Sequence, residues 1–254
     1  MLPLSVAIIA KDEADRLPLA IASVGGLAAE VVVIESGSRD DTVAVALALG
    51  ARVVQTDWPG HVAQKNRALD LCTQPWVLCL DADEQLSPEL RASIQIVVQG
   101  DPDTSGCEVD RMSWWLSHPL RHGTWYPDRR VRLVRRGRAR WVGQNPHDRL
   151  EVDGPVGRLK GDLLHHPYRD LAEHLATIDR YTAIAADELR RAGTVARWWD
   201  VALRPPLHIV KALLLKAGIL DGVPGLCVAG LGGVYVLLKW GRRHLEQGSS
   251  RGGA

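Results

Sequence analysis

The amino-acid sequence predicts an α/β fold in which a mostly parallel sheet is flanked by helices. The first observation is a series of apolar runs of strand length, which lack the alternation of a half-exposed strand and so suit buried parallel strands. These runs cover residues 4–10, 31–34, 51–56 and 76–80. The second observation is that helical patterns separate them, at residues 13–24, 42–49 and 62–71. Strands that alternate with helices of this length predict β-α-β units.

A different organisation is expected after the first hundred residues. Ser87 and Pro88 are a helix-start signal, and the helix that they open should run to residue 98. Shorter strands between turn residues follow, at 108–115, 130–135 and 138–142, and then a long helix at 171–192. This pattern predicts a mixed, partly antiparallel segment added to the first sheet. We therefore divide the chain into three regions, residues 1–110, 111–192 and 193–254, the last an apolar helical tail with a disordered end.

Composition and charge exclude several classes of protein. The formal net charge of +1 over 254 residues argues against a general nucleic-acid binder, which carries a strong basic excess. Eight arginines nevertheless lie between positions 121 and 140, where they form either a local field for phosphates or anionic lipid, or an ordinary solvated surface. The four cysteines show no paired spacing, so neither a zinc site nor a disulfide framework is indicated.

The tail is strongly apolar at residues 207–238, although Lys211, Lys216 and Asp221 interrupt it. Its longest uncharged piece, 222–238, is close to the lower limit of roughly 17 residues for crossing a bilayer. The tail is either an interfacial helix with its lysines at lipid headgroups or a hydrophobic hairpin packed on the protein's own core. We predict peripheral membrane contact. The N-terminal run lacks a charged leader, so the predicted compartment is the cytoplasm, at the inner face of the cell membrane.

Two aspartates follow the fourth apolar run with one small residue between them. Because side chains alternate along an extended chain, Asp81 and Asp83 are expected on the same side where the strand ends. Two carboxylates held in this way suit a hard divalent cation that also carries a phosphate-bearing substrate. The alternative is a polar loop that ends the strand and caps the following helix.

Two further groups of polar residues lie at the expected sheet edge. Glu35 ends the second apolar run and is followed by a Gly-containing turn, which is where α/β sheets bind nucleotides. Its neighbours Ser38 and Asp40 could instead cap the next helix. Lys65 and Asn66 open the third helix, as a donor to a diphosphate and a hydrogen-bonding partner, although a solvated helix face has the same composition.

Taken together, these landmarks resemble the inverting family-2 glycosyltransferases, which bind nucleotide-sugars with a fold of the GT-A type. The landmarks are residues 8–13, 35–42, 64–66 and 80–84. The sequence is similar in particular to the lipopolysaccharide-core β-1,4-glucosyltransferase-like branch, through residues 125–129, 146–150, 165–168 and 218–222. The resemblance covers nearly the whole chain. It implies that residues 1–110 bind the nucleotide-sugar and that residues 111–192 provide the acceptor side and the catalytic groups.

The resemblance also implies roles for individual residues. Asp148 would be the general base that activates the acceptor hydroxyl, assisted by His147, although Asp148 could instead form a surface ion pair with Arg149. The implied donor-binding residues are Asp12, Glu35, Lys65, Asn66 and Asp81. The implied ligands of a divalent cation, Mg²⁺ or Mn²⁺, are Asp83, Asp81 and His165. The favoured donor is UDP-glucose, and the acceptor is an envelope glycan or the lipopolysaccharide core.

Three positions depart from the family pattern. Asp12 stands where the family usually has Asn, Glu35 where it has Asp, and Asp148 where it has Glu. These changes keep open a non-catalytic alternative, a glycosyltransferase-like membrane-associated assembly protein. A phosphatase of the Asp-x-Asp type fits less well, because Asp83 is followed by Glu84. A nucleotidyltransferase fits less well too, because the first run is not followed by a glycine-rich loop.

Overall fold

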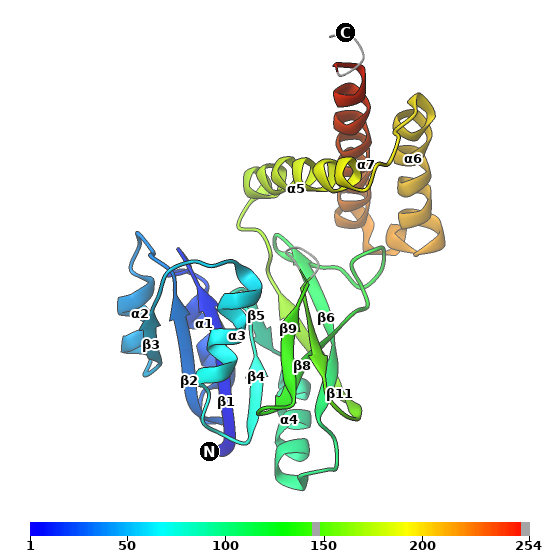
Figure 1. Ribbon diagram of the computed structural model, residues 1–254. Helices are drawn as coiled ribbons and strands as arrows, with labels where there is room; N and C mark the ends of the chain where they lie inside the picture. The colour runs from blue at the N-terminus through cyan, green and yellow to red at the C-terminus, as the bar shows by residue number, and fades with distance from the viewer. Residues whose placement is uncertain (144–147, 250–254) are drawn as a thin grey trace. The chain divides into compact units, whose positions relative to one another are not determined.

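The computed structural model describes residues 1–143 and 148–249, which fold into two compact units (Figure 1). The first, here called the sheet unit, consists of Met1–Met112 and Asp128–His165. The second, the helical unit, consists of Ser113–Pro127 and His166–Ala254. The chain therefore leaves the sheet unit once in the middle, returns to it, and finally continues into the helical unit.

The sheet unit is built on one mixed sheet with the strand order β3-β2-β1-β4-β8-β6-β11-β5. The strands are β1 (Leu2–Ala10), β2 (Ala28–Glu35), β3 (Arg52–Gln55), β4 (Trp76–Cys79), β5 (Glu84–Leu86), β6 (Gly106–Trp115), β8 (Asp128–Arg135) and β11 (Val156–His165). Strands β1 to β4 pair in parallel, and β8 pairs antiparallel with both β4 and β6. A separate antiparallel pair is formed by β9 (Ala139–Val142) and β10 (Arg149–Val152).

Alternating side chains of β1 build two cores, one on each face of the sheet. Leu4, Val6 and Ile8 are fully buried in the larger core, which also contains the apolar sides of α1 (Leu17–Val24) and α4 (Pro88–Gly100). Ala7 lies in the second core, with residues of α3 (His61–Leu71) and of β9 and β10. A short helix, α2 (Thr42–Ala48), connects β2 to β3. Helices thus cover both faces of the parallel strands, as runs of continuous apolar residues require.

The predicted α/β sheet is confirmed, with differences at some elements. The first helix begins at Leu17 instead of residue 13, because Glu13 to Arg16 form a turn whose carbonyl groups accept the first helical bonds. Strands β5, β10 and β11 were not predicted. In β11, glycine and charged residues alternate with few apolar ones, so its sequence lacks the pattern of a buried strand.

The helical unit is formed by α5 (Leu171–Arg191), α6 (Trp198–Val210) and α7 (Gly222–Ser249), with the short strand β7 (His118–Pro119) paired to the end of β6. Two single turns, η1 (Lys211–Leu215) and η2 (Gly218–Asp221), join α6 to α7. The long helix expected at 171–192 is confirmed as α5. The apolar tail is a helix pair that begins earlier than residue 207, and Pro205 and Pro206 lie inside α6.

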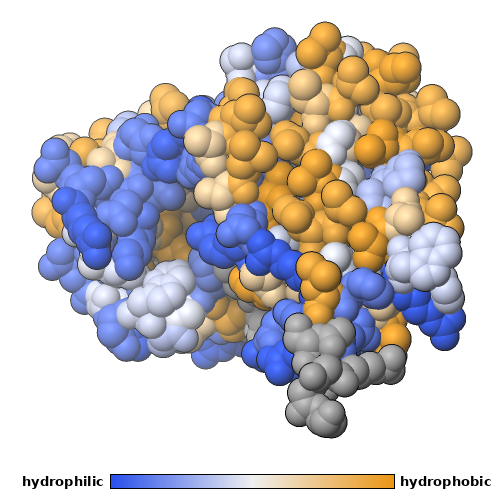
Figure 2. All heavy atoms as spheres, turned by 90° about the horizontal axis from the view of Figure 1, so that it is seen from above, coloured by the Kyte–Doolittle hydropathy of each residue, from blue (hydrophilic) through white to orange (hydrophobic). Residues whose placement is uncertain are grey.

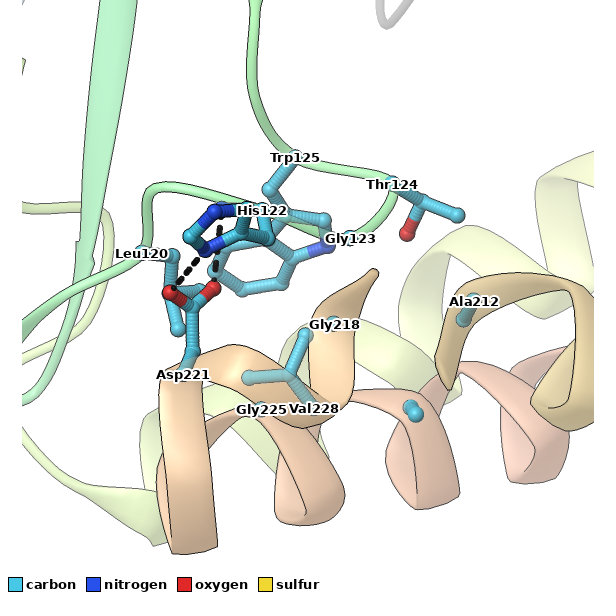
Figure 3. A pocket seen from close by; sticks show the side chains of 11 residues that line it. Leu120, His122, Gly123, Thr124, Trp125, Ala212, Gly218, Asp221, Gly225 and Val228 are labelled. Atoms are coloured by element: carbon cyan, nitrogen blue, oxygen red, sulfur yellow. Dashed lines mark hydrogen bonds and ion pairs between the residues drawn. The ribbon is translucent and has the colours of Figure 1, made fainter. Parts of the chain in front are cut away.

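A loop of the helical unit is fixed to the turn that precedes α7 (Figure 3). The Asp221 carboxylate accepts hydrogen bonds from the backbone N–H groups of Arg121 (3.2 Å) and His122 (2.9 Å). It also contacts Nδ1 of His122 at 2.8 Å. Leu120 and Gly123 line a small pocket beside this contact. Asp221 therefore joins the loop after β7 to the helical tail.

Candidate active site

The two predicted metal-binding aspartates lie on a tight turn after β4. Strand β4 ends at Cys79, and the backbone N–H of Glu84 donates to the carbonyl of Asp81 at 3.0 Å. In return, the Glu84 carboxylate accepts the Asp81 N–H at 3.0 Å. The expectation that extended-chain alternation places Asp81 and Asp83 together is therefore wrong, since a turn places them. Helix α4 is capped by Ser87, whose hydroxyl accepts from Leu90, and not by the aspartates.

Both carboxylate oxygens of Asp81 face cations. Lys65 Nζ lies 3.2 Å from Oδ1, and the Arg132 guanidinium donates to Oδ2 at 2.8 Å. Burial alone would raise the pKa of Asp81, but Arg132 and Lys65 outweigh it and hold this pKa well below its ordinary value. Asp81 is therefore ionised at neutral pH and is already neutralised by side chains of the protein.

Asp83 has a different partner, His165 at the end of β11. The antiparallel register pairs His165 with Glu84, and this brings the imidazole Nε2 to 3.4 Å from Oδ2 of Asp83. Burial raises the pKa of Asp83, and the nearby His165 more than offsets this, so the net shift is downward. Two ligands of an octahedral ion at about 2.1 Å are roughly 3 Å apart, so this pair fits one shared cation.

The described residues contain no set of three or more His, Cys, Asp or Glu side chains arranged to hold a metal ion. Asp83 and His165 would therefore supply two ligands at most, with Asp81 turned toward Lys65 and Arg132. Magnesium and manganese are commonly held by one or two protein ligands together with substrate phosphates. The donor set thus fits a cation that arrives with, or is completed by, a diphosphate.

Asp148, the predicted base, contacts Lys65. Its Oδ2 lies 2.9 Å from Lys65 Nζ, and the two side chains are 12% and 13% exposed. The alternative partner, Arg149, pairs with Glu151 instead. Burial lowers the pKa of Lys65, but the carboxylates of Asp81 and Asp148 outweigh it and raise this pKa. His147 lies outside the described residues.

Sequence reasoning did not identify the residues that hold the cluster of Lys65, Asp81 and Asp148 in place. Arg132 of β8 is buried, with its guanidinium 2.5 Å from the fully buried carboxylate of Glu84. Arg111 lies 3.5 Å from Glu84 and 2.6 Å from Asp128. The available signal was the position of Arg132 between Val131 and Leu133, since an arginine that is buried among apolar residues needs a charged partner.

The remaining predicted donor-binding residues form hydrogen bonds to other residues of the protein. The amide of Asn66 donates to the carbonyl of Trp141 and accepts its N–H, both at 2.9 Å, which ties α3 to β9. Glu35, buried at the end of β2, accepts from the N–H of Ser38 and from Gln55 Nε2 at 3.4 Å. Asp12 has φ of 57° and accepts the N–H of Arg39 at 2.7 Å. Their roles in donor binding stay predictions.

The comparison with known proteins identifies the family of the chain. The model of the family described as "Glycosyl transferase family 2" matches residues 5–146, which is more than half of the chain. The chain belongs to this family and is a glycosyltransferase. The α/β fold of GT-A type that the sequence resemblance implied is thereby confirmed.

Two curated relatives illustrate the similarity. The chain is 29% identical over 244 residues to "Lipopolysaccharide core biosynthesis glycosyltransferase LpsC" of Rhizobium meliloti, covering 93% of this chain and 90% of the relative. It is 48% identical over 94 residues to an "Uncharacterized glycosyltransferase" of Rickettsia felis, covering 37% of this chain and 33% of the relative. The second similarity thus spans only about a third of the relative's length.

Among solved structures, the chain is similar to glucosyl-3-phosphoglycerate synthase of Mycobacterium tuberculosis in complex with Mn²⁺, UDP-glucose and phosphoglyceric acid. The identity is 26%, the TM-score is 0.36, and the match covers 46% of this chain and 45% of the other. The crystal structure of a mycobacterial protein matches at 21% identity with a TM-score of 0.47, covering 76% and 75% of the two chains.

Proposed function

We propose that this glycosyltransferase is metal-dependent and inverting, and that it moves a sugar from a nucleotide-sugar to the lipopolysaccharide core or another envelope glycan. The observation that carries the proposal is the position of Lys65 between Asp81 and Asp148. The ammonium group of Lys65 thus contacts both Asp81, in the turn after β4, and Asp148, the candidate base. UDP-glucose is the favoured donor on the resemblance to the family. The full-length similarity to LpsC favours a lipopolysaccharide-core acceptor.

The residues of the cluster divide the work of a single displacement. Asp148 accepts the proton of the acceptor hydroxyl as its oxygen attacks the anomeric carbon. The bond from that carbon to the diphosphate breaks, and negative charge develops on the leaving group. Lys65 and Arg132 are held beside Asp81 in a partly buried site, where fixed cations stabilise such charge most strongly.

Asp83 and His165 would hold the divalent cation in this proposal. A bound Mg²⁺ or Mn²⁺ would act as a Lewis acid, which would neutralise the diphosphate and favour its departure. Asp81 would contribute by orienting Lys65 and Arg132 toward the donor.

Two substitutions test the proposal with separate readouts. Asp148→Asn is expected to lower kcat by about 10³-fold, the scale of general-base catalysis, with nucleotide affinity within threefold of the original. Asp83→Ala is expected to abolish the Mn²⁺-dependent component of UDP binding in calorimetry. Glu151→Gln, an exposed carboxylate close in sequence to Asp148, is the matched control and should leave both quantities unchanged. Unchanged turnover in Asp148→Asn would remove Asp148 from the base role.

The non-catalytic alternative is disfavoured by family membership and by the paired, partly buried position of Asp148. Turnover of UDP-glucose by the purified chain, with Mg²⁺ or Mn²⁺ and a lipopolysaccharide-core acceptor, separates the two directly.

We also propose that the enzyme works on the cytoplasmic face of the membrane and contacts it peripherally through residues 207–238. Such a location would suit an acceptor that is itself a glycolipid.

A further inference from the structure

Helices α6 and α7 pack against each other through glycines. A Cβ atom added to Gly232 would lie 2.5 Å from Nε2 of His208, and one added to Gly233 would lie 2.6 Å from Cδ1 of Ile209. Further along, the Arg204 guanidinium lies 4.1 Å from the centre of the Trp240 ring. The two helices therefore form an antiparallel hairpin that η1 and η2 close at one end.

The open end of this hairpin is also fixed. His244 Nδ1 lies 2.8 Å from the carbonyl oxygen of Ala196, just before α6. Gln247 donates to the same carbonyl at 3.1 Å and accepts the N–H of Ala196 at 3.2 Å. The end of α7 and the start of α6 are thus held side by side.

The hairpin presents a broad apolar surface to its surroundings. Three of its most exposed large apolar residues lie around its closed end: Leu215 is 79% exposed, Val223 72% and Leu220 69%. At the open end, Leu245 is 71% exposed. Other large exposed apolar residues of the hairpin are Trp198, Leu203, Leu207, Val210, Leu214, Ile219 and Leu226. Figure 2 shows hydrophobic side chains gathered over the helical unit. A surface with so many exposed aliphatic side chains marks a binding face, since single exposed residues are normal but contiguous ones are not.

The hairpin is also strongly cationic. Between positions 197 and 249 the sequence has seven Lys and Arg residues, two Asp and one Glu. Both aspartates are already engaged, Asp200 with Arg204 at 2.7 Å and Asp221 with the loop at His122. The exposed Lys211 and Lys216 border the apolar residues of η1. An apolar face bordered by cations complements the boundary between the acyl chains and the headgroups of an anionic bilayer.

We propose that this hairpin lies in one leaflet of an anionic bilayer and does not span it, a mode of attachment that rests on the proposed membrane-facing function. By length and composition alone, one helix of the described residues could cross a membrane, at Gly218–Gln247, and 22% of its most apolar window is buried. However, α6 is packed along it. With 13 residues, α6 is about 20 Å long, which is shorter than the hydrocarbon core of about 30 Å.

Spanning would also place charges in the hydrocarbon. If α7 crossed the bilayer, α6 would be drawn in with it, together with Arg204, His208 and Lys211. Arg204 and Lys211 would both be cations there, and a cation at the centre of a bilayer is strongly disfavoured. At the interface, by contrast, these side chains reach headgroups, and Trp198 and Trp199 take the position that tryptophan prefers in membrane proteins.

Vesicle flotation of the full chain tests the proposal. Wild-type protein is expected to float with vesicles of phosphatidylcholine and phosphatidylglycerol, and at least tenfold less with phosphatidylcholine alone. Leu215→Asp/Leu220→Asp should lower binding to the anionic vesicles at least tenfold. The matched control, Leu47→Asp/Ile96→Asp, changes two exposed apolar residues of the sheet unit and should bind as wild type. Equal loss in both pairs, or no loss in the first, would overturn the proposal.

Further measurements separate the other possibilities. Lys211→Glu/Lys216→Glu should abolish the preference for anionic vesicles without a change in the circular dichroism spectrum. Bound protein should transfer to an added second population of vesicles, which a spanning helix cannot do. If light scattering instead finds a dimer that Leu215→Asp/Leu220→Asp dissociates while vesicle binding persists, the surface binds a second copy and the proposal is wrong. Asp148→Asn should float as wild type, so loss of catalysis and loss of membrane binding are distinguishable.

Discussion

Lys65 and Asp148, 83 positions apart in the sequence, form an ion pair with 2.9 Å between Nζ and Oδ2. Lys65 comes from α3, and Asp148 immediately precedes β10. The same ammonium group lies 3.2 Å from Asp81 and 4.3 Å from the centre of the Trp141 ring. Lys65 is therefore the group that links the acidic turn to the candidate base.

Replacement of this ammonium group should impair donor binding and catalysis together. Lys65→Met leaves Asp81 and Asp148 without a shared cation, so we expect kcat/KM for the nucleotide-sugar to fall about 10²-fold. Lys65 also helps to lower the pKa of Asp81, so this pKa should be higher in the variant than in the wild type. Lys65→Arg retains the charge and should recover some of the activity. Steady-state kinetics at neutral pH measure the loss in Lys65→Met and the partial recovery in Lys65→Arg.

Arg132 should contribute to stability as well as to the site. Arg132→Met leaves the fully buried Glu84 without its closest cation, and removing one partner of a buried pair costs about 3–5 kcal/mol. Arg130→Met, in the same strand, removes a pair whose arginine side chain is 40% exposed and should cost less than about 1 kcal/mol. Urea unfolding compares them. Equal losses would show that the Arg132–Glu84 pair has no special energetic role.

Asn66 is expected to act on the framework and not on the donor. Asn66→Ala removes two hydrogen bonds to the backbone of the buried Trp141, for a cost of about 1–3 kcal/mol in unfolding free energy. Gln99→Ala, at an exposed position of α4, is the control and should stay within about 0.5 kcal/mol of wild type. A fall in UDP affinity at unchanged stability would instead place Asn66 in contact with the donor.

The helical unit should lose stability in mild acid because of His174. This histidine is buried, and burial lowers its pKa from 6.5 to about 4. Its Nδ1 accepts the Nε1–H of Trp115 at 3.1 Å, which only the neutral ring can do. Between pH 6.5 and 4 the unfolded chain therefore binds a proton that the folded chain does not, so stability falls as the pH falls through this window.

Thermal unfolding between pH 7 and 4.5 measures this dependence. His174→Phe should show a shallower loss of stability than wild type over the same range, because it has no group to protonate. His118→Ala changes an exposed histidine of β7 and should follow the wild-type curve. Identical slopes in all three proteins would contradict the assignment to His174.

The sequence was sufficient to predict the part of the fold in which the pattern of apolar residues matches the buried positions. Strands β1, β2 and β4 consist mostly of apolar residues, so their pattern and the helices between them were predictable. Strand β11 was not, because its residues alternate between glycine, charge and aliphatic side chains. Yet β11 delivers His165 to Asp83, and only the antiparallel pairing with β5 brings the two together.

The same limit applies to the site. Short motifs identified Asp81 and Asp83, which follow an apolar run, and Lys65, which opens a helix. The buried pairing of Arg132 with Glu84 joins residues 48 positions apart, and no local pattern specifies it. Glycines 232 and 233 lie where α7 packs closely against α6, and no local pattern of the apolar tail specifies this contact.

The bonds that join Ala196 to His244 and Gln247 have a consequence for topology. Because the start of α6 and the end of α7 are bonded to each other, both ends of the hairpin lie on the same side of the membrane. An epitope or protease site attached after α7 would thus stay in the same solution as the start of α6. In intact vesicles that bind the protein from outside, externally added protease should remove such a tag completely.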